Sequence, residues 1–148
     1  MSVDFKISPL TKDKIDSVAS LEAACFSVPF TKKALDELFL NTCWHFLVAE
    51  VNNTVVGYIS FYTIIDETEI VNLCVLPEYR RAGIARALVN GAIDMSRSLG
   101  ASKLMLEVRA SNTGAIKLYE GFGFFPVGVS KNHYSSPTED AILMNSEL

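Results

Sequence analysis

The chain has 148 residues, of which 49% are apolar. This is enough for one compact core and too little for two, so we expect a single domain over residues 1–148. The net charge of −4, with both signs spread along the chain, excludes the basic arm or stripe that nucleic-acid binding requires. No run approaches the roughly 20 apolar residues that span a bilayer, and residues 1–6 lack the pattern of an export signal. We therefore expect a soluble protein with neither a membrane nor a nucleic acid as its partner.

The cysteines and histidines do not form a recognisable framework. Cys25, Cys43 and Cys74 are odd in number and far apart in sequence, which fits neither a set of disulfides nor a zinc knuckle. This usage predicts a reducing, cytoplasmic location. His45 and His133 have no partners at metal-ligand spacing, so we expect no metal site.

The first third of the chain is predicted to be mainly helical. Residues 5–7 form a short strand that Pro9 ends. Thr11 is a suitable N-cap for an amphipathic helix that finishes before Pro29. Thr31 can cap a second, shorter helix, and both helices should lie over the sheet that follows.

The middle of the chain has the composition of strands. Residues 44–51 and 54–65 are rich in β-branched and aromatic side chains, and Asn52-Asn53 between them suits the positive backbone angles of a tight hairpin turn. The acidic residues between 66 and 69 mark another turn before a strand over 70–75. These segments predict an antiparallel meander.

The second half alternates helices and strands. A helical period runs over 83–100 with a glycine at each end, and residues 104–108 return to a strand. Ser111-Asn112 can cap another helix, which is followed by strands over 124–129 and 141–144. The predicted order is β-αα-βββ-α-β-α-ββ, an α/β (mixed α+β) fold with helices on both faces of a mixed sheet.

The segment 75–88 is the most informative part of the sequence. A strand stops at Pro77 and a helix starts in a turn of small residues, which aims free backbone N–H groups and the positive end of the helix dipole at one space. Gly83 would let a phosphate oxygen approach the backbone closely, and Ala85 has the smallest side chain after glycine. Positive charge comes from Arg80, Arg81 and Arg86. The structural alternative is an ordinary helix start with surface arginines.

The same turn resembles a known family. Arg80-x-x-Gly83-x-Ala85, following 72–75 and Pro77, matches the Gln/Arg-x-x-Gly-x-Gly/Ala coenzyme A motif of the GNAT acetyltransferases. The resemblance implies acetyl-CoA as co-substrate and a GNAT-like, mainly antiparallel sheet of about seven strands. Amides from Arg81 to Arg86 would hold the pyrophosphate. The residues that it assigns to the coenzyme are Leu73, Cys74, Val75, Arg80, Arg81, Ala82, Gly83, Ile84, Ala85, Arg86 and Asn112.

The downstream half resembles a subgroup of that family. Residues 106–112 and 115–124, with Asn132-x-Tyr134, are similar to the ribosomal-protein-alanine N-acetyltransferases, the RimI type. The resemblance implies direct acetyl transfer to the N-terminal alanine amine of a ribosomal protein. It assigns Glu107 as the proton acceptor and Tyr119 as the proton donor to the departing thiol.

Amine chemistry is compatible with such an acceptor. At neutral pH roughly one α-amine in ten is neutral, whereas fewer than one lysine in a thousand is, so an α-amine needs only a modest base. The structural alternatives are an exposed Glu107 paired with Arg109 or Lys103, and a Tyr119 that only packs in the core. For Cys74 we expect packing in a buried strand and no transfer of the acetyl group.

Two other functions stay open from the sequence. The first is a GNAT enzyme that acts on a small amine or a lysine side chain. The second is a module that binds acetyl-CoA without transferring its acetyl group, and the presence of both Glu107 and Tyr119 argues against it.

Overall fold

The computed structural model describes residues 3–148; Met1 and Ser2 lie outside it. Its strands are β1 (Lys6–Pro9), β2 (Trp44–Val51), β3 (Thr54–Ile64), β4 (Glu67–Val75), β5 (Lys103–Arg109), β6 (Phe125–Tyr134) and β7 (Glu139–Glu147). Its α-helices are α1 (Ile15–Cys25), α2 (Lys32–Phe39), α3 (Ile84–Ser98) and α4 (Thr113–Glu120). Short 3-10 turns, η1 (Lys12–Lys14) and η2 (Pro77–Tyr79), precede α1 and α3. This order confirms the predicted fold class.

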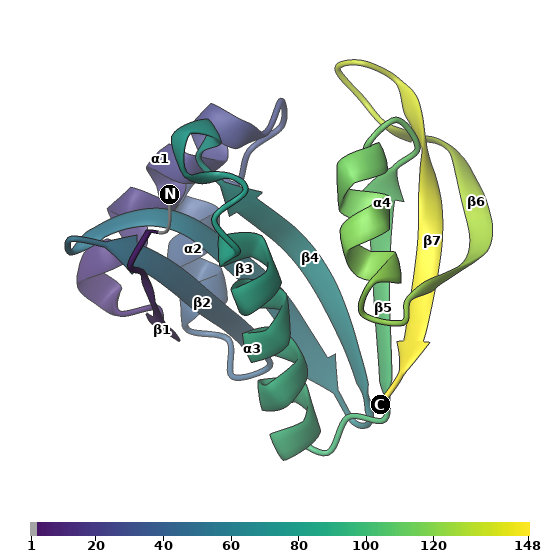
Figure 1. Cartoon of the computed structure of the whole chain (residues 1–148), viewed down its shortest axis with the longest axis horizontal. Helices are drawn as coiled ribbons and strands as arrows, with labels where there is room; N and C mark the ends of the chain where they lie inside the picture. Colours follow the sequence, from purple (N-terminus) through teal and green to yellow (C-terminus); the bar gives the residue numbers. More distant parts are fainter. Residues whose placement is uncertain (1–2) are drawn as a thin grey trace.

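The strands form one sheet in the order β1-β2-β3-β4-β5-β7-β6. Neighbouring strands are antiparallel except for β4 and β5, which are parallel because α3 connects them as a crossover (Figure 1). The β2–β3 hairpin turns through Asn52 and Asn53, which have φ angles of 50° and 65°. The predicted tight turn is therefore confirmed.

β4 and β5 separate part of the way along their length. Their pairing runs only from Glu67↔Lys103 to Ile70↔Leu106, and beyond these residues the two strands diverge (Figure 1). The next residues of both strands, 71–73 and 107–109, face an opening instead of each other. This divergence positions the candidate site.

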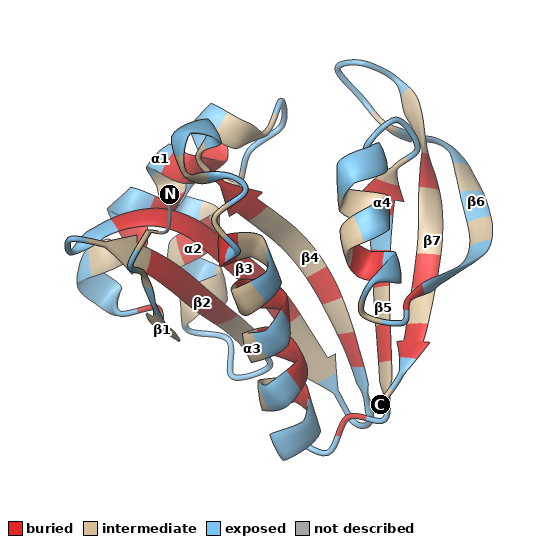
Figure 2. Ribbon diagram, viewed as in Figure 1, coloured by how far each residue is buried: buried red, intermediate tan, exposed pale blue. Residues whose placement is uncertain are grey.

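Helices cover both faces of the sheet. α3 and α4 bury one core with β2, β3 and the strands beyond them, while α1 and α2 bury a second core on the opposite face. β2 serves both cores, since Leu47 and Ala49 point to the first and Phe46 and Val48 to the second. Figure 2 shows the buried stripe of α3 turned to the sheet and its other side exposed. None of the helices within residues 3–148 is long and apolar enough to cross a membrane.

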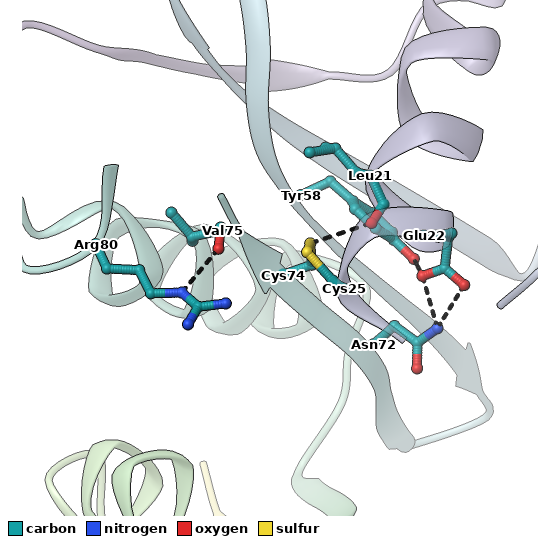
Figure 3. Close-up of a disulfide and its surroundings, with 8 residues drawn as sticks. All are labelled: Leu21, Glu22, Cys25, Tyr58, Asn72, Cys74, Val75 and Arg80. Carbon is teal, nitrogen blue, oxygen red and sulfur yellow. Dashed lines mark hydrogen bonds between the residues drawn. A yellow bond between two sulfur atoms is a disulfide. The ribbon is translucent and has the colours of Figure 1, made fainter. Parts of the chain in front are cut away.

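The expectation of no disulfide was wrong. Cys25 at the end of α1 and Cys74 in β4 form a disulfide, although 49 positions separate them in the sequence (Figure 3). They meet because α1 packs against β3 and β4. This contact cannot be predicted from the spacing of the two cysteines in the sequence. Cys43 is free and exposed.

Some predicted boundaries shifted. β4 begins at Glu67, so Glu67 and Glu69 lie in the strand and the turn is shorter than expected. Thr11 caps no helix through its side chain; its hydroxyl donates to Asp13 instead. Thr31 does cap α2 by accepting a hydrogen bond from the Ala34 amide at 3.1 Å.

Candidate active site

A pocket of about 910 Å³ occupies the opening between β4 and β5. Its floor is formed by residues 69–73 of β4 and 107–109 of β5, and α4 contributes Tyr119. Residues 25–28 after α1 form one wall, and 133–139 at the β6–β7 hairpin form another. The pocket thus lies where the sheet lacks pairing and where connecting segments can reach a ligand.

Glu107 faces this pocket from β5. Its Oε2 lies 2.6 Å from Nε2 of His133 on β6. Its partner is therefore neither Arg109 nor Lys103, which were the candidates from sequence. Glu69 lies nearby on β4 and accepts a hydrogen bond from the Tyr62 hydroxyl. Burial raises the pKa of Glu69, and the neighbouring Glu107 carboxylate raises it further.

Tyr119 enters the same pocket from α4. The side chain of Asn112 begins this helix by accepting a hydrogen bond from the Ala115 amide at 3.1 Å, which confirms the predicted cap. Tyr119 is 6% exposed and its ring packs edge-on against Phe124, with centroids 5.4 Å apart. Burial, with a smaller contribution from Tyr134, raises the pKa of the Tyr119 hydroxyl. Tyr119 is therefore a protonated donor at neutral pH.

Arg109 joins the walls of the pocket. Its guanidinium donates to the carbonyl oxygens of Ser135 and Pro137, both at 3.0 Å, and forms an ion pair of 3.2 Å with Glu139. It also reaches Oγ of Ser27, across the pocket after α1, at 3.4 Å. In the sequence, Arg109 stood out only as a basic residue two positions after Glu107. Its partners in the structure are all distant in sequence.

A buried carboxylate supports the wall after α1. Glu22 is fully buried and accepts hydrogen bonds from the Tyr58 hydroxyl and the Asn72 amide group (Figure 3). It also accepts one from the Phe30 backbone N–H. The Phe30 bond, at 2.7 Å, ties the α1–α2 connection to the sheet. Desolvation by burial raises the pKa of Glu22, and these hydrogen bonds partly offset it. The role of Glu22 was not predicted from the sequence, because a single acidic residue in an amphipathic helix normally lies on the solvent-exposed face.

The turn before α3 fits an anionic ligand. The first amide bonded within the helix is that of Ala87, which donates to Gly83 at 3.0 Å, so the preceding amides of the first turn have no helical partner. Gly83, the residue before these amides in the chain, has a φ of 84°, and a Cβ there would lie in open space. Arg80 turns back to the end of β4, where its Nε donates to the Val75 carbonyl at 3.0 Å (Figure 3). Arg80 therefore supports the turn.

The predicted site residues fall into two groups. Leu73, Glu107, Asn112 and Tyr119 line the pocket. Cys74, Val75 and the turn over 80–86 lie outside its lining. Cys74 is buried and has its sulfur in the disulfide, in agreement with the packing role expected for it. Among residues 3–148, no three His, Cys, Asp or Glu side chains gather as a metal site would require.

Comparison with known proteins identifies the class. The pattern of the Acetyltransferase (GNAT) family matches residues 15–124. The chain therefore belongs to the GNAT acetyltransferases, and it is an enzyme that transfers an acetyl group from acetyl-CoA to an amine.

Its relatives are more specific. A Bacillus subtilis (strain 168) protein, provisionally named ribosomal protein bS18-alanine N-acetyltransferase, is 37% identical over 89% of this chain and 88% of its own. The ribosomal protein bS18-alanine N-acetyltransferase of Escherichia coli (strain K12) is 33% identical over 93% of this chain and 94% of its own. The crystal structure of the ribosomal-protein-S18-alanine N-acetyltransferase from Escherichia coli superposes with a TM-score of 0.89 and 29% identity, covering 97% and 94% of the two chains. The predicted RimI-type resemblance is confirmed.

Proposed function

We propose that this chain acetylates the N-terminal α-amine of the ribosomal protein bS18, with alanine as the acetylated residue. The acetyl group passes directly from acetyl-CoA to the amine while both substrates are bound, with Glu107 as the general base and Tyr119 as the general acid. Residues 1–148 act as one catalytic domain, and a ribosomal acceptor places the enzyme in the cytoplasm.

One observation carries the proposal: Glu107 and Tyr119, which lie on different elements, line the same pocket between β4 and β5. A base and a donor are the two functions that amide formation from a thioester requires. The names of the relatives supply the acceptor, because they act on the alanine of bS18 and cover nearly all of this chain.

Acetyl-CoA, when bound, supplies the activated acetyl group. The amides at the start of α3, with the positive end of the helix dipole, suit its pyrophosphate. The unpaired edge of β4 beyond Ile70, including Leu73 and Val75, offers backbone groups to the pantetheine arm. Asn112 already uses Oδ1 as the cap of α4, so we assign its contact with the coenzyme to the side-chain Nδ2 group.

The protein groups act on two protons. Glu107 takes a proton from the acceptor amine, directly or through a water molecule. Tyr119 donates a hydrogen bond to the departing sulfur, and its proton passes to the sulfur in concert with collapse of the intermediate, because a free thiolate is too weak a base to deprotonate a buried phenol. Its burial keeps water away from this side of the pocket and strengthens that hydrogen bond.

The test is an acetyl-transfer assay with three acceptors, in which mass spectrometry locates the acetyl group. The first is a peptide with the bS18 N-terminus and a free alanine amine. The second is the same peptide with a blocked N-terminus and one lysine, and the third is a polyamine. We expect acetylation of the alanine amine alone. Acetylation of only the lysine or the polyamine would reject the proposed acceptor while retaining the enzyme class.

A further inference from the structure

His133 occupies a position that the function above does not use. It lies on β6, near the end of the hairpin that forms one wall of the pocket. Its Nε2 lies 2.6 Å from Oε2 of Glu107, and its Nδ1 lies 3.3 Å from Oγ of Ser130. Both ring nitrogens therefore have partners, which fixes the plane of the imidazole.

We propose that His133 is a positioning residue for Glu107, holding one carboxylate oxygen so that the other faces the acceptor amine. The inference rests on the proposed role of Glu107 as general base. Nε2–H donates to Oε2, which leaves Oε1 free toward the pocket. In this arrangement His133 acts through Glu107.

Glu107 needs such a partner because its surroundings do not otherwise hold it. The side chain is 37% exposed, so its rotamers are not restricted by packing. The carboxylate of Glu69 lies on the neighbouring strand and repels it. A hydrogen bond from the opposite wall holds Glu107 against that repulsion, and small displacements of a catalytic group are costly in rate.

The kinetic test uses two substitutions at one position. His133→Phe removes the donor and should lower kcat on the order of tenfold to a hundredfold, with the Kd for acetyl-CoA unchanged. His133→Gln supplies an amide donor in place of the imidazole, so it should recover part of the kcat that His133→Phe loses. Lys131→Gln, an exposed change on the same strand, is the control and should behave as wild type.

A double variant separates positioning from a general structural effect. If His133 acts only through Glu107, the variant Glu107→Gln/His133→Phe should be no slower than Glu107→Gln alone. Additive losses would overturn the proposal, as would wild-type kcat in His133→Phe.

A measurement without turnover distinguishes this proposal from the proposed function. The ring N–H signal of His133, followed by NMR at one fixed pH, should shift in Glu107→Gln, because the carboxylate that accepts its hydrogen bond is replaced by an amide. His45 of β2, which packs on Phe61 of β3, serves as the internal reference and should not change. An unchanged His133 signal would reject the pair itself. A shifted signal in an enzyme that acetylates none of the three acceptors would reject the proposed function and leave the pair intact.

Discussion

Burial determines what the Tyr119 hydroxyl can do. The side chain lies between α4 and β5 with almost no exposure, and desolvation raises its pKa above the ordinary value of 10.0. The neutral phenol is therefore the form present through neutral and mildly alkaline pH. A group in that state is a weaker acid than an ordinary phenol, and a thiolate, the base of a thiol with a reference pKa of about 8.5, does not remove its proton outright. Tyr119 therefore acts by donating a hydrogen bond that stabilises the developing thiolate, with the proton passing in concert with collapse of the intermediate.

Tyr119→Phe tests this role. The phenyl ring can keep the packing against Phe124, so the fold, the melting temperature and acetyl-CoA binding should change little. Turnover should fall on the order of a hundredfold, because the lost contact strengthens in the transition state. Thermal unfolding and steady-state kinetics are measured on the same variant. A lower melting temperature with near-normal turnover would make Tyr119 a packing residue.

Glu22 should make stability depend on pH in an identifiable direction. Burial raises its folded-state pKa above the ordinary 4.5, so the folded protein holds the Glu22 proton more tightly than the unfolded chain does. Its contribution to stability is then fully present below about pH 4.5 and declines as the pH rises through the folded-state value. Gln at this position cannot ionise.

The measurement is urea unfolding of the wild type and Glu22→Gln between pH 4.5 and 8. The free energy of unfolding of the wild type minus that of the variant should decrease as the pH rises. A difference that increases with pH would show that the hydrogen bonds from Tyr58, Asn72 and Phe30 outweigh desolvation.

At the scale of elements, the start of α3 offers a matched pair of glycines. Gly83 and Gly100 flank the same helix, have φ angles of 84° and 89°, and each has open space around an added Cβ. A valine should therefore introduce similar backbone strain, on the order of 1–3 kcal/mol, at either end. Only Gly83 is the residue at the N-terminus of α3, next in the chain to the free amides.

We expect Gly83→Val to lose acetyl-CoA binding and Gly100→Val to retain it. Calorimetric titration with acetyl-CoA gives the affinity, and circular dichroism shows whether each variant is folded. Wild-type affinity in a folded Gly83→Val would show that the phosphates of acetyl-CoA do not bind at this turn.

At the scale of the whole molecule, the disulfide joins two layers. It connects the end of α1, beside the pocket wall, to the buried strand β4. Closing a loop of this length restricts the unfolded chain, and disulfides typically contribute about 2–4 kcal/mol to stability.

Alkylation of the native protein under non-reducing conditions should modify one cysteine, the exposed Cys43. A reductant, or Cys25→Ser, should lower the free energy of unfolding by about 2–4 kcal/mol. Cys43→Ser is the control and should leave stability unchanged. Alkylation of all three thiols in the folded, unreduced protein would contradict the disulfide.

The sequence by itself determined the element order and the nature of the turn before α3, because local rules govern both. Enrichment in β-branched and aromatic residues defined the strands, and Thr31, Asn112 and Gly83 marked helix ends through their own backbone and cap geometry. The family resemblance identified Glu107 and Tyr119 as candidates. Tertiary structure alone decided the partners: His133 for Glu107, and Cys74 for Cys25. Such pairs depend on which strands are neighbours and where β4 and β5 diverge, and these are contacts between residues far apart in the chain that no local pattern encodes.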